Sequence, residues 1–361
     1  MTNLLTAHHQ WASRPADERF QTFDQLETAV AGRRISSTPA TWLSAGLHFR
    51  ETSSGDLVVA GGQVYEGARF SNWSFRQTAG LLGAPADFVA GLPTRVAADV
   101  LNVQACRRKR DEGRVQVLLQ DRPGDRPMLR AVTSEKYSRA IWDIDVVRMV
   151  RQLVDGTSFR NPLAFAAGEF GGREEPGGLY ASDRDCFITV WDQEHPVEVD
   201  GELLFRFALF WNSETGARTF GATLGLVRTI CRNLILWGAR DLVDIRLRHV
   251  GAIDERIKEE IPRILDALGQ TDPTRERDVI RAALRKQIAK NDDEAVTFLT
   301  ENGFTRRVAR EAVGMAVLEE GGAGSLWQIV QGVTAHARSI PHRDQRAVLE
   351  RQAGRLLELA A

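Results

Sequence analysis

Three strand-like segments follow one another in the middle of the chain, and they constrain the fold more than any other feature. They are DCFITVWDQ (185–193), ELLFRFALFWN (202–212) and RTFGAT (218–223), each rich in β-branched and aromatic residues. The last two are joined by the short connection at 212–216, as is typical of antiparallel strands. Antiparallel strands separated along the chain from helices indicate an α+β fold, with an antiparallel-sheet core domain and flanking helices.

From residue 252 onward the pattern becomes helical. Helices are predicted at 252–268, 274–290, 293–302, 305–320, 325–338 and 343–359, separated by Pro and Gly residues. Two more strands, at 114–121 and 127–134, and a helix that begins at Asp143 precede the central strands. We therefore predict a polar N-terminal segment at 1–60, an α+β core domain at 61–270 and an all-helical C-terminal domain at 271–361.

The composition excludes several classes of protein. The 361 residues are 43% hydrophobic and 26% charged, with a net charge of −1, which is typical of a soluble globular protein and excludes nucleic-acid binding over the whole surface. The three cysteines, Cys106, Cys186 and Cys231, are too few and too far apart for a disulfide framework. The N-terminus lacks the apolar region of a signal peptide, and no stretch is long and apolar enough for a membrane span. A cytoplasmic protein without a membrane partner is expected.

The segment GLVRTICRNLILWGARD (225–241) is predicted to be a helix packed on the sheet. Its apolar residues recur at helical spacing and form one stripe: Val227, Ile230, Cys231, Leu234 and Ile235. Arg228 and Arg232 lie on the other side and are expected to point outward. Although both arginines flank Cys231, its position on the apolar stripe favours packing over nucleophilic chemistry.

No motif commits the chain to an enzyme. CxxC, HExxH, Walker A and GxSxG patterns are absent, and no GxGxxG follows a predicted strand. Cys186, Cys231 and His249 lack the spacing of a zinc site, and a histidine on an apolar strand face is typical of a buried, hydrogen-bonded side chain. We expect no metal, no cofactor and no enzymatic activity.

Basic residues interleaved with aromatic ones are the strongest functional signal. The predicted nucleic-acid-binding residues are Arg107, Arg108, Lys109, Arg110, Arg114, Arg130, Lys136, Tyr137 and Arg139, with Arg228 and Arg232 as a second strip. Phosphate neutralisation together with stacking on Tyr137 and Trp142 favours single-stranded DNA as the partner. A solvated surface with internal ion pairs remains the alternative, because acidic residues lie among the same arginines: Asp111, Glu112, Asp121 and Asp125.

A second candidate is DDEAVTFLTENGFTRRVAREAVGMAVLEEG (292–321), which has the pattern of a helix, a short glycine turn and a second helix. Thr305 is the predicted N-cap of the second helix. Arg306, Arg307 and Arg310 follow it, at the positions where a recognition helix contacts DNA.

Three segments resemble the phage/plasmid-like proteins that carry domain of unknown function 932. They are SEKYSRAIWDIDVV (134–147), the stretch from FALFWNSETG to RHVGAIDERI (207–257) and SLWQIVQGVTAHAR (325–338). The shared residues are Asn212, Ser213 and Gly216 of an Asn-Ser-x-x-Gly hairpin, Cys231 and Asn233 of a Cys-x-Asn pattern, and the pair Arg248 and His249. The resemblance covers most of residues 65–260.

The resemblance implies a mobile-element setting and supplies no catalytic residues. It favours a non-enzymatic nucleic-acid-binding protein that acts in replication or recombination, such as single-strand annealing or protection, and that forms a homo-oligomer. The alternative is a protein-interaction or defence-modulating factor that binds no nucleic acid. Asn233 and His249 are expected to hydrogen-bond and fix the predicted helix against the next strand.

Overall fold

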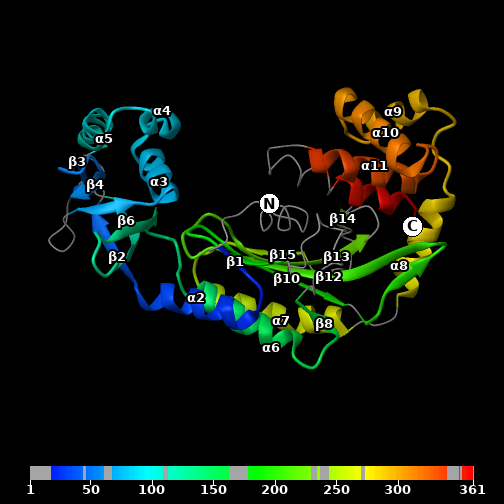
Figure 1. The fold of residues 1–361 in the computed structure, drawn as a ribbon, viewed down its shortest axis with the longest axis horizontal. Helices are drawn as coiled ribbons and strands as arrows, with labels where there is room; N and C mark the ends of the chain where they lie inside the picture. Colours follow the sequence, from blue (N-terminus) through cyan, green and yellow to red (C-terminus); the bar gives the residue numbers. More distant parts are fainter. Residues whose placement is uncertain are drawn as a thin grey trace.

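The computed structural model describes residues 18–43, 46–60, 67–108, 113–161, 178–192, 194–228, 234–235, 244–269, 273–339, 349 and 352–360. The protein is a crescent in which two arms rise on the same side of a central sheet (Figure 1). Helices α2 (Phe23–Ile35), α6 (Asp143–Val154) and α7 (Ile253–Gly269) cover the other side of that sheet. Antiparallel strands with flanking helices and a helical C-terminal region confirm the predicted α+β fold.

The described strand pairs of the central sheet are all antiparallel, and its main path runs in the order β1-β9-β10-β12-β13-β14. The strands are β1 (Arg19–Phe20), β8 (Phe159–Arg160), β9 (Leu179–Ala181), β10 (Cys186–Asp192), β11 (Val197–Val199), β12 (Glu202–Asn212), β13 (Phe220–Arg228), β14 (Leu234–Ile235) and β15 (Asp244–Leu247). Ile188, Val190, Ala208 and Phe210 pack with α6 and α7 in one core. Alternate residues of β10 and β12 therefore meet the helical layer, as the period of two in a strand requires.

The predicted helix at 225–241 is wrong where the structure describes it. Strand β13 continues through Arg228, with Phe205 opposite Val227, and Leu234 of β14 pairs with Val227 from the other side. A short apolar run satisfies helical and strand periodicity about equally well, and here the long neighbouring strand β12 supplies the hydrogen-bonding partners. Residues 229–233 and 236–243, which complete the predicted helix, lie outside the described residues.

The N-terminal arm contains a second sheet, in the order β2-β6-β7-β5-β4-β3, which the sequence did not predict as a unit. Its elements are β2 (Ser37–Leu43), β3 (His48–Glu51), β4 (Leu57–Ala60), β5 (Ala68–Phe70), β6 (Arg114–Gln120), β7 (Met128–Ser134), α3 (Asn72–Leu82), α4 (Ala86–Ala90) and α5 (Thr94–Arg108). Strand β2 pairs with β6 and β4 pairs with β5, so hydrogen bonds of this sheet cross the predicted boundary at residue 60. The three-domain division stays a prediction.

The C-terminal arm is helical and packs on one end of the central sheet. It contains α8 (Thr274–Arg285), α9 (Asp292–Glu301), α10 (Arg306–Glu320), α11 (Leu326–Ser339) and the short 3-10 helix η3 (Glu358–Ala360). The Thr305 hydroxyl accepts a hydrogen bond from the Val308 N–H, which confirms the predicted N-cap. Trp327 is buried in a core that also includes Val197 and Leu204 of the sheet.

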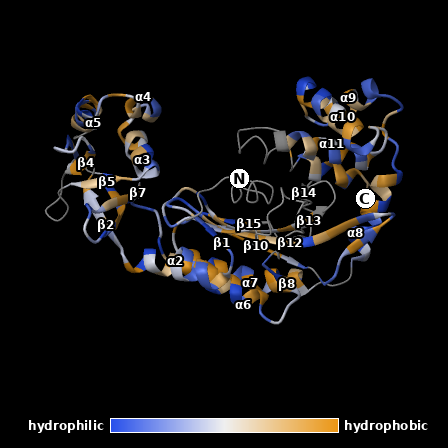
Figure 2. Cartoon of the chain, in the orientation of Figure 1, coloured by the Kyte–Doolittle hydropathy of each residue, from blue (hydrophilic) through white to orange (hydrophobic). Residues whose placement is uncertain are grey.

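The helices of both arms carry apolar and polar residues side by side along their length (Figure 2). This is the pattern of helices that bury one face and expose the other. Among the helices that the structure describes, none combines the length and the apolar character that crossing a membrane requires.

Candidate functional site at the junction of the central sheet and the N-terminal arm

The turn between β12 and β13 is the point at which the central sheet meets the N-terminal arm. The hydroxyls of Ser213 and Thr215 both donate hydrogen bonds to the Arg184 carbonyl, at 2.6 and 2.8 Å. The Thr215 carbonyl accepts hydrogen bonds from Trp73 Nε1 (3.1 Å) and Gln77 Nε2 (2.8 Å) of α3. One turn therefore holds the β9–β10 connection on one side and the first helix of the arm on the other.

Gly216 completes this turn and has a φ of +79°. A Cβ atom at this position would lie 2.8 Å from Thr133 Cγ2 and 3.4 Å from Tyr137 Cε2. Backbone conformation and close packing thus both require glycine here.

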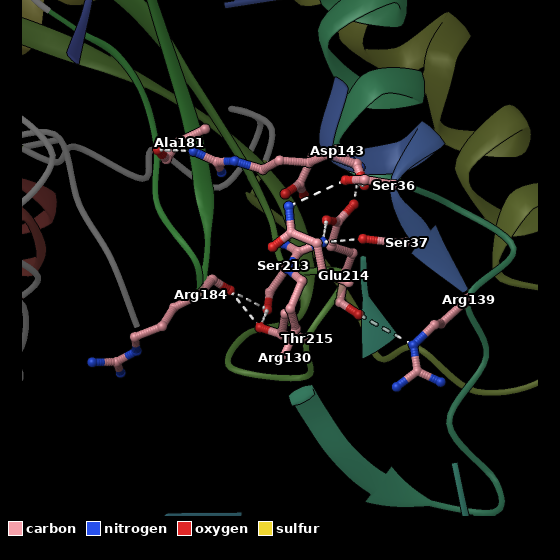
Figure 3. A network of polar contacts seen from close by, with 12 residues as sticks. Ser36, Ser37, Arg130, Arg139, Asp143, Ala181, Arg184, Ser213, Glu214 and Thr215 are labelled. Carbon is pink, nitrogen blue, oxygen red and sulfur yellow. Dashed lines mark hydrogen bonds and ion pairs between the residues drawn. The ribbon is translucent and has the colours of Figure 1, made fainter. Parts of the chain in front are cut away.

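Charged groups are buried directly beside the turn (Figure 3). Arg130 Nη1 lies 2.6 Å from Glu214 Oε1, and each side chain is 2% exposed. The same Nη1 donates to Ser37 Oγ at 3.0 Å, and Glu214 Oε2 accepts from the Asp143 N–H at 3.3 Å. Asn212 Nδ2 donates to Asp143 Oδ1 at 2.8 Å. Two carboxyl groups and one guanidinium from three separate parts of the chain therefore form one network.

This network is not fully satisfied. Arg130 Nη2 and Asn212 Oδ1 are buried and make no hydrogen bond with the described part of the chain. An unpaired buried polar group costs about 1–3 kcal/mol, and a buried ion pair is weak evidence for stability. The contribution of these buried charges to stability therefore does not by itself explain why they are at the junction.

Burial also changes the protonation of the network. Burial, and after it the negative charge of Glu214, raise the pKa of Asp143 from its ordinary value near 3.8 to about 8. At neutral pH a protonated Asp143 leaves the charges of Arg130 and Glu214 to balance each other. Burial, followed by the charge of Asp143, raises the pKa of the nearby Cys186 thiol, so this cysteine is not an activated nucleophile.

Tyr137 extends the network toward β15. Its hydroxyl donates to the Ser213 carbonyl at 2.5 Å, and its ring stacks on His249 with 5.1 Å between the ring centroids. Arg139 Cζ lies 5.1 Å from the centroid of the Tyr137 ring, and Arg139 Nε donates to the Glu214 carbonyl at 3.3 Å. Burial raises the pKa of Tyr137, which keeps its hydroxyl a hydrogen-bond donor.

Burial lowers the pKa of His249 to about 4, and the positive charges of Arg139 and Arg256 act in the same direction. The Ser138 N–H donates a hydrogen bond to the backbone carbonyl of His249 at 2.8 Å. His249 is therefore neutral and buried, as the sequence predicted, but the predicted hydrogen bond of its ring is not made with the described residues, where both ring nitrogens are without a partner. Its predicted partner Asn233 lies outside the described residues; among the described residues the His249 ring stacks on Tyr137.

Several residues predicted to bind nucleic acid serve internal contacts instead. Arg130 is buried in its ion pair, and Tyr137 and Arg139 contact the β12–β13 turn. Trp142, the second predicted stacking side chain, is 7% exposed, and Arg34 Cζ lies 3.9 Å from its ring centroid. None of these four side chains offers a phosphate or a base the open surface that the sequence interpretation required.

The other predicted residues divide into two groups. Arg107, Arg114 and Lys136 are exposed. For Arg108 and Arg228 the structure describes only the backbone, at the ends of α5 and β13, while Lys109, Arg110 and Arg232 lie outside the described residues. Within the described ranges, no group of three or more His, Cys, Asp or Glu side chains is arranged to hold a metal ion.

The second candidate of the sequence, the α9–α10 pair, has its arginines at the surface. Arg306, Arg307 and Arg310 are all exposed in the first two turns of α10, and the first turn contains no acidic residue. Arg307 Nε lies 3.8 Å from Glu311 Oε1, near the limit of an ion pair. Gly303, with a φ of +88°, forms the turn between the two helices.

Sequence reasoning missed Asp143 and Glu214 as site residues. Asp143 was predicted only as the start of a helix, and Glu214 occupies an unspecified position of the Asn-Ser-x-x-Gly pattern. That pattern was the available signal, because its remaining residues form the turn on which the network is built.

Comparison with known proteins gives one match. A family model described as "Domain of unknown function (DUF932)" matches residues 131–353, which include the β12–β13 turn, Asp143 and the α9–α10 pair. No curated protein and no solved structure matches the chain. Because the family model covers more than half of the chain, this protein belongs to the DUF932 family.

Proposed function

We propose that this protein is a non-enzymatic nucleic-acid-binding protein that contacts the phosphate backbone through α10. One observation carries the proposal: Arg306, Arg307 and Arg310 are exposed at the start of the second helix of a helix–turn–helix pair. Cations in a first helical turn oppose the helix dipole, so the stability of α10 does not account for them. Arginine at this position suits phosphate, because its planar group donates two parallel hydrogen bonds.

The arrangement of the arms supports an extended partner. Both arms rise on the same side of the central sheet, so a polymer that runs from α10 across this side of the sheet would also reach the N-terminal arm (Figure 1). In that arm Val115 pairs with Ser134, which places the exposed Arg114 and Lys136 at the same end of the β6–β7 hairpin. These two cations are the proposed additional phosphate contacts.

The proposed partner includes duplex DNA. The preference for single strands expected from the sequence depended on stacking by Tyr137 and Trp142, and both side chains have internal contacts. A second helix with exposed arginines at its start fits a duplex groove and its phosphates. We therefore propose that a duplex binds at least as tightly as a single strand. A role in replication or recombination of a phage- or plasmid-type element rests on the family resemblance alone.

Fluorescence anisotropy with a labelled oligonucleotide, single-stranded and as its duplex, tests this proposal over a series of salt concentrations. The variant Arg306→Ala/Arg310→Ala is expected to weaken binding of the duplex and to reduce the slope of log K against log salt by about 2, one for each lost phosphate contact.

The matched control is Lys258→Ala/Arg263→Ala. It removes two exposed cations from α7, on the side of the central sheet opposite to the arms, and should leave affinity and slope unchanged. Equal losses in the two double variants would contradict the assignment to α10. A wild-type protein that binds neither probe at low salt would contradict nucleic-acid binding and favour the protein-interaction alternative.

A further inference from the structure

The outer face of α5 is apolar at its centre although it is exposed. Val96 and Val103 are 44% and 53% exposed, and Cys106 is exposed beside them. The opposite face of the helix is buried against the sheet of the N-terminal arm, through Ala97, Ala98, Leu101 and Ala105. These exposed β-branched side chains are free for a second contact, because the inner face of the helix is already packed.

Charged residues flank this apolar centre in a symmetric order. Asp99, Val103 and Arg107 are spaced by four residues and therefore form one ridge along the helix, and all three are exposed. Within the part of the chain that the structure describes, neither Asp99 nor Arg107 has an ion-pair partner. They also line one shallow depression of the surface, together with Asn102 and Cys106.

The order acid, apolar, base is complementary to itself when the helix is reversed. An antiparallel copy of α5 with Val103 against Val103 places Asp99 opposite Arg107 of the copy, and Arg107 opposite Asp99. A parallel copy would place like charges together. This is the property of an isologous interface, in which one patch on each of two identical subunits meets itself around a two-fold axis.

We propose that α5 is a self-association surface and that its occupant is α5 of a second copy of this protein, in antiparallel orientation. One helix pair buries less than the roughly 1,200–2,000 Å² of a stable interface. The dimer is therefore weak, and its population rises with protein concentration. The proposal depends on α5 and not on α10, so it stands or fails separately from nucleic-acid binding.

Sedimentation velocity over a concentration series measures the dimer directly. The two-fold axis of the proposed dimer places each substitution in both subunits. Asp99→Arg and Arg107→Asp therefore each convert two attractive Asp–Arg pairs into two repulsive pairs of like charge. Each single variant should therefore raise the dissociation constant of the dimer on the order of tenfold or more. The double variant Asp99→Arg/Arg107→Asp restores both opposite-charge pairs and should dimerise like the wild type.

An equimolar mixture of the two single variants gives a sharper result. Each variant alone carries like charges at both ends of the ridge, whereas the mixed pair has opposite charges at both ends, so a heterodimer should form. Lys258→Asp is the control, since it makes the same charge change at an exposed position of α7, away from α5, and should leave the dimer intact. Melting temperatures confirm that the exposed substitutions leave each variant folded. A wild type that is monomeric at all concentrations, or single variants that dimerise as the wild type does, would overturn the proposal.

Discussion

Arg130 of β7 and Glu214 of the β12–β13 turn form an ion pair of 2.6 Å inside the protein, where each side chain is 2% exposed. The pair joins the N-terminal arm to the central sheet. The Glu214 carboxylate also accepts a hydrogen bond from the Asp143 N–H group. The orientation of this arm relative to the rest of the crescent therefore depends on buried charges.

Removing one partner of this ion pair should destabilise the folded protein. Glu214→Gln leaves the Arg130 guanidinium buried without a counter-charge and is expected to lower the free energy of unfolding by about 3–5 kcal/mol. The double variant Arg130→Met/Glu214→Gln should lose less than the sum of its single variants, because no unpaired charge remains. Urea unfolding followed by circular dichroism measures the free energy of unfolding of Glu214→Gln, of Arg130→Met and of the double variant. Arg148→Met, which breaks the exposed pair with Glu27, is the control and should cost no more than about 1 kcal/mol. Additive losses in the double variant would show that the two side chains are energetically independent.

The contribution of Asp143 to the stability of the protein should fall as pH rises between about 4 and about 8. The pKa of Asp143 is raised from 3.8 to about 8 in the folded state, so over this window the folded protein holds a proton that the unfolded chain has lost. Asp143→Asn removes this proton linkage while it keeps the size of the side chain. The variant should therefore gain stability relative to the wild type as pH rises, by up to about 1.4 kcal/mol per pH unit, and the gain should stop above about pH 8. Melting temperatures across the pH range test this, and a constant difference between the two proteins would contradict it.

His249 should produce a dependence of the opposite sign at lower pH. Its pKa is lowered from 6.5 to about 4, so between these values the unfolded chain binds a proton that the folded protein does not, and stability falls as pH decreases. His249→Phe retains a ring against Tyr137 but cannot titrate. The stability of the wild type relative to this variant should decline from pH 6.5 to pH 4 and stay constant above that range. Repeating the series in the Asp143→Asn background separates the two overlapping windows.

Gly216→Ala should loosen the β12–β13 turn. The new Cβ would combine a strained φ with a contact of 2.8 Å to Thr133 Cγ2, and we expect a loss of about 1–3 kcal/mol in unfolding free energy. Gly201→Ala is the matched control, since Gly201 also has a positive φ, +89°, but has open space around it. The difference between the two variants isolates the clash from the backbone strain. Equal losses would mean that Gly216 serves backbone conformation alone.

Elements whose pattern is local could be predicted from the sequence alone. Strands β6, β7, β10 and β12 and helices α7 to α11 were predicted from periodicity and from the residues that begin and end them, such as Thr305. These signals are reliable because backbone hydrogen bonds of a helix or a hairpin join residues close in the chain. The exposure of Arg306, Arg307 and Arg310 follows from the same logic, since the apolar positions of α10 already define its buried face.

The remaining features depend on contacts between residues far apart in the sequence. Residues 225–228 became the end of a strand because β12 lay beside them, and Arg130, Tyr137 and Trp142 became internal because partners from distant parts of the chain reached them. A sequence pattern shows that a side chain is charged or aromatic, but not whether a carboxylate or a ring elsewhere in the chain will cover it. That depends on how the arm docks on the sheet, and the docking is set by contacts between residues far apart in the sequence.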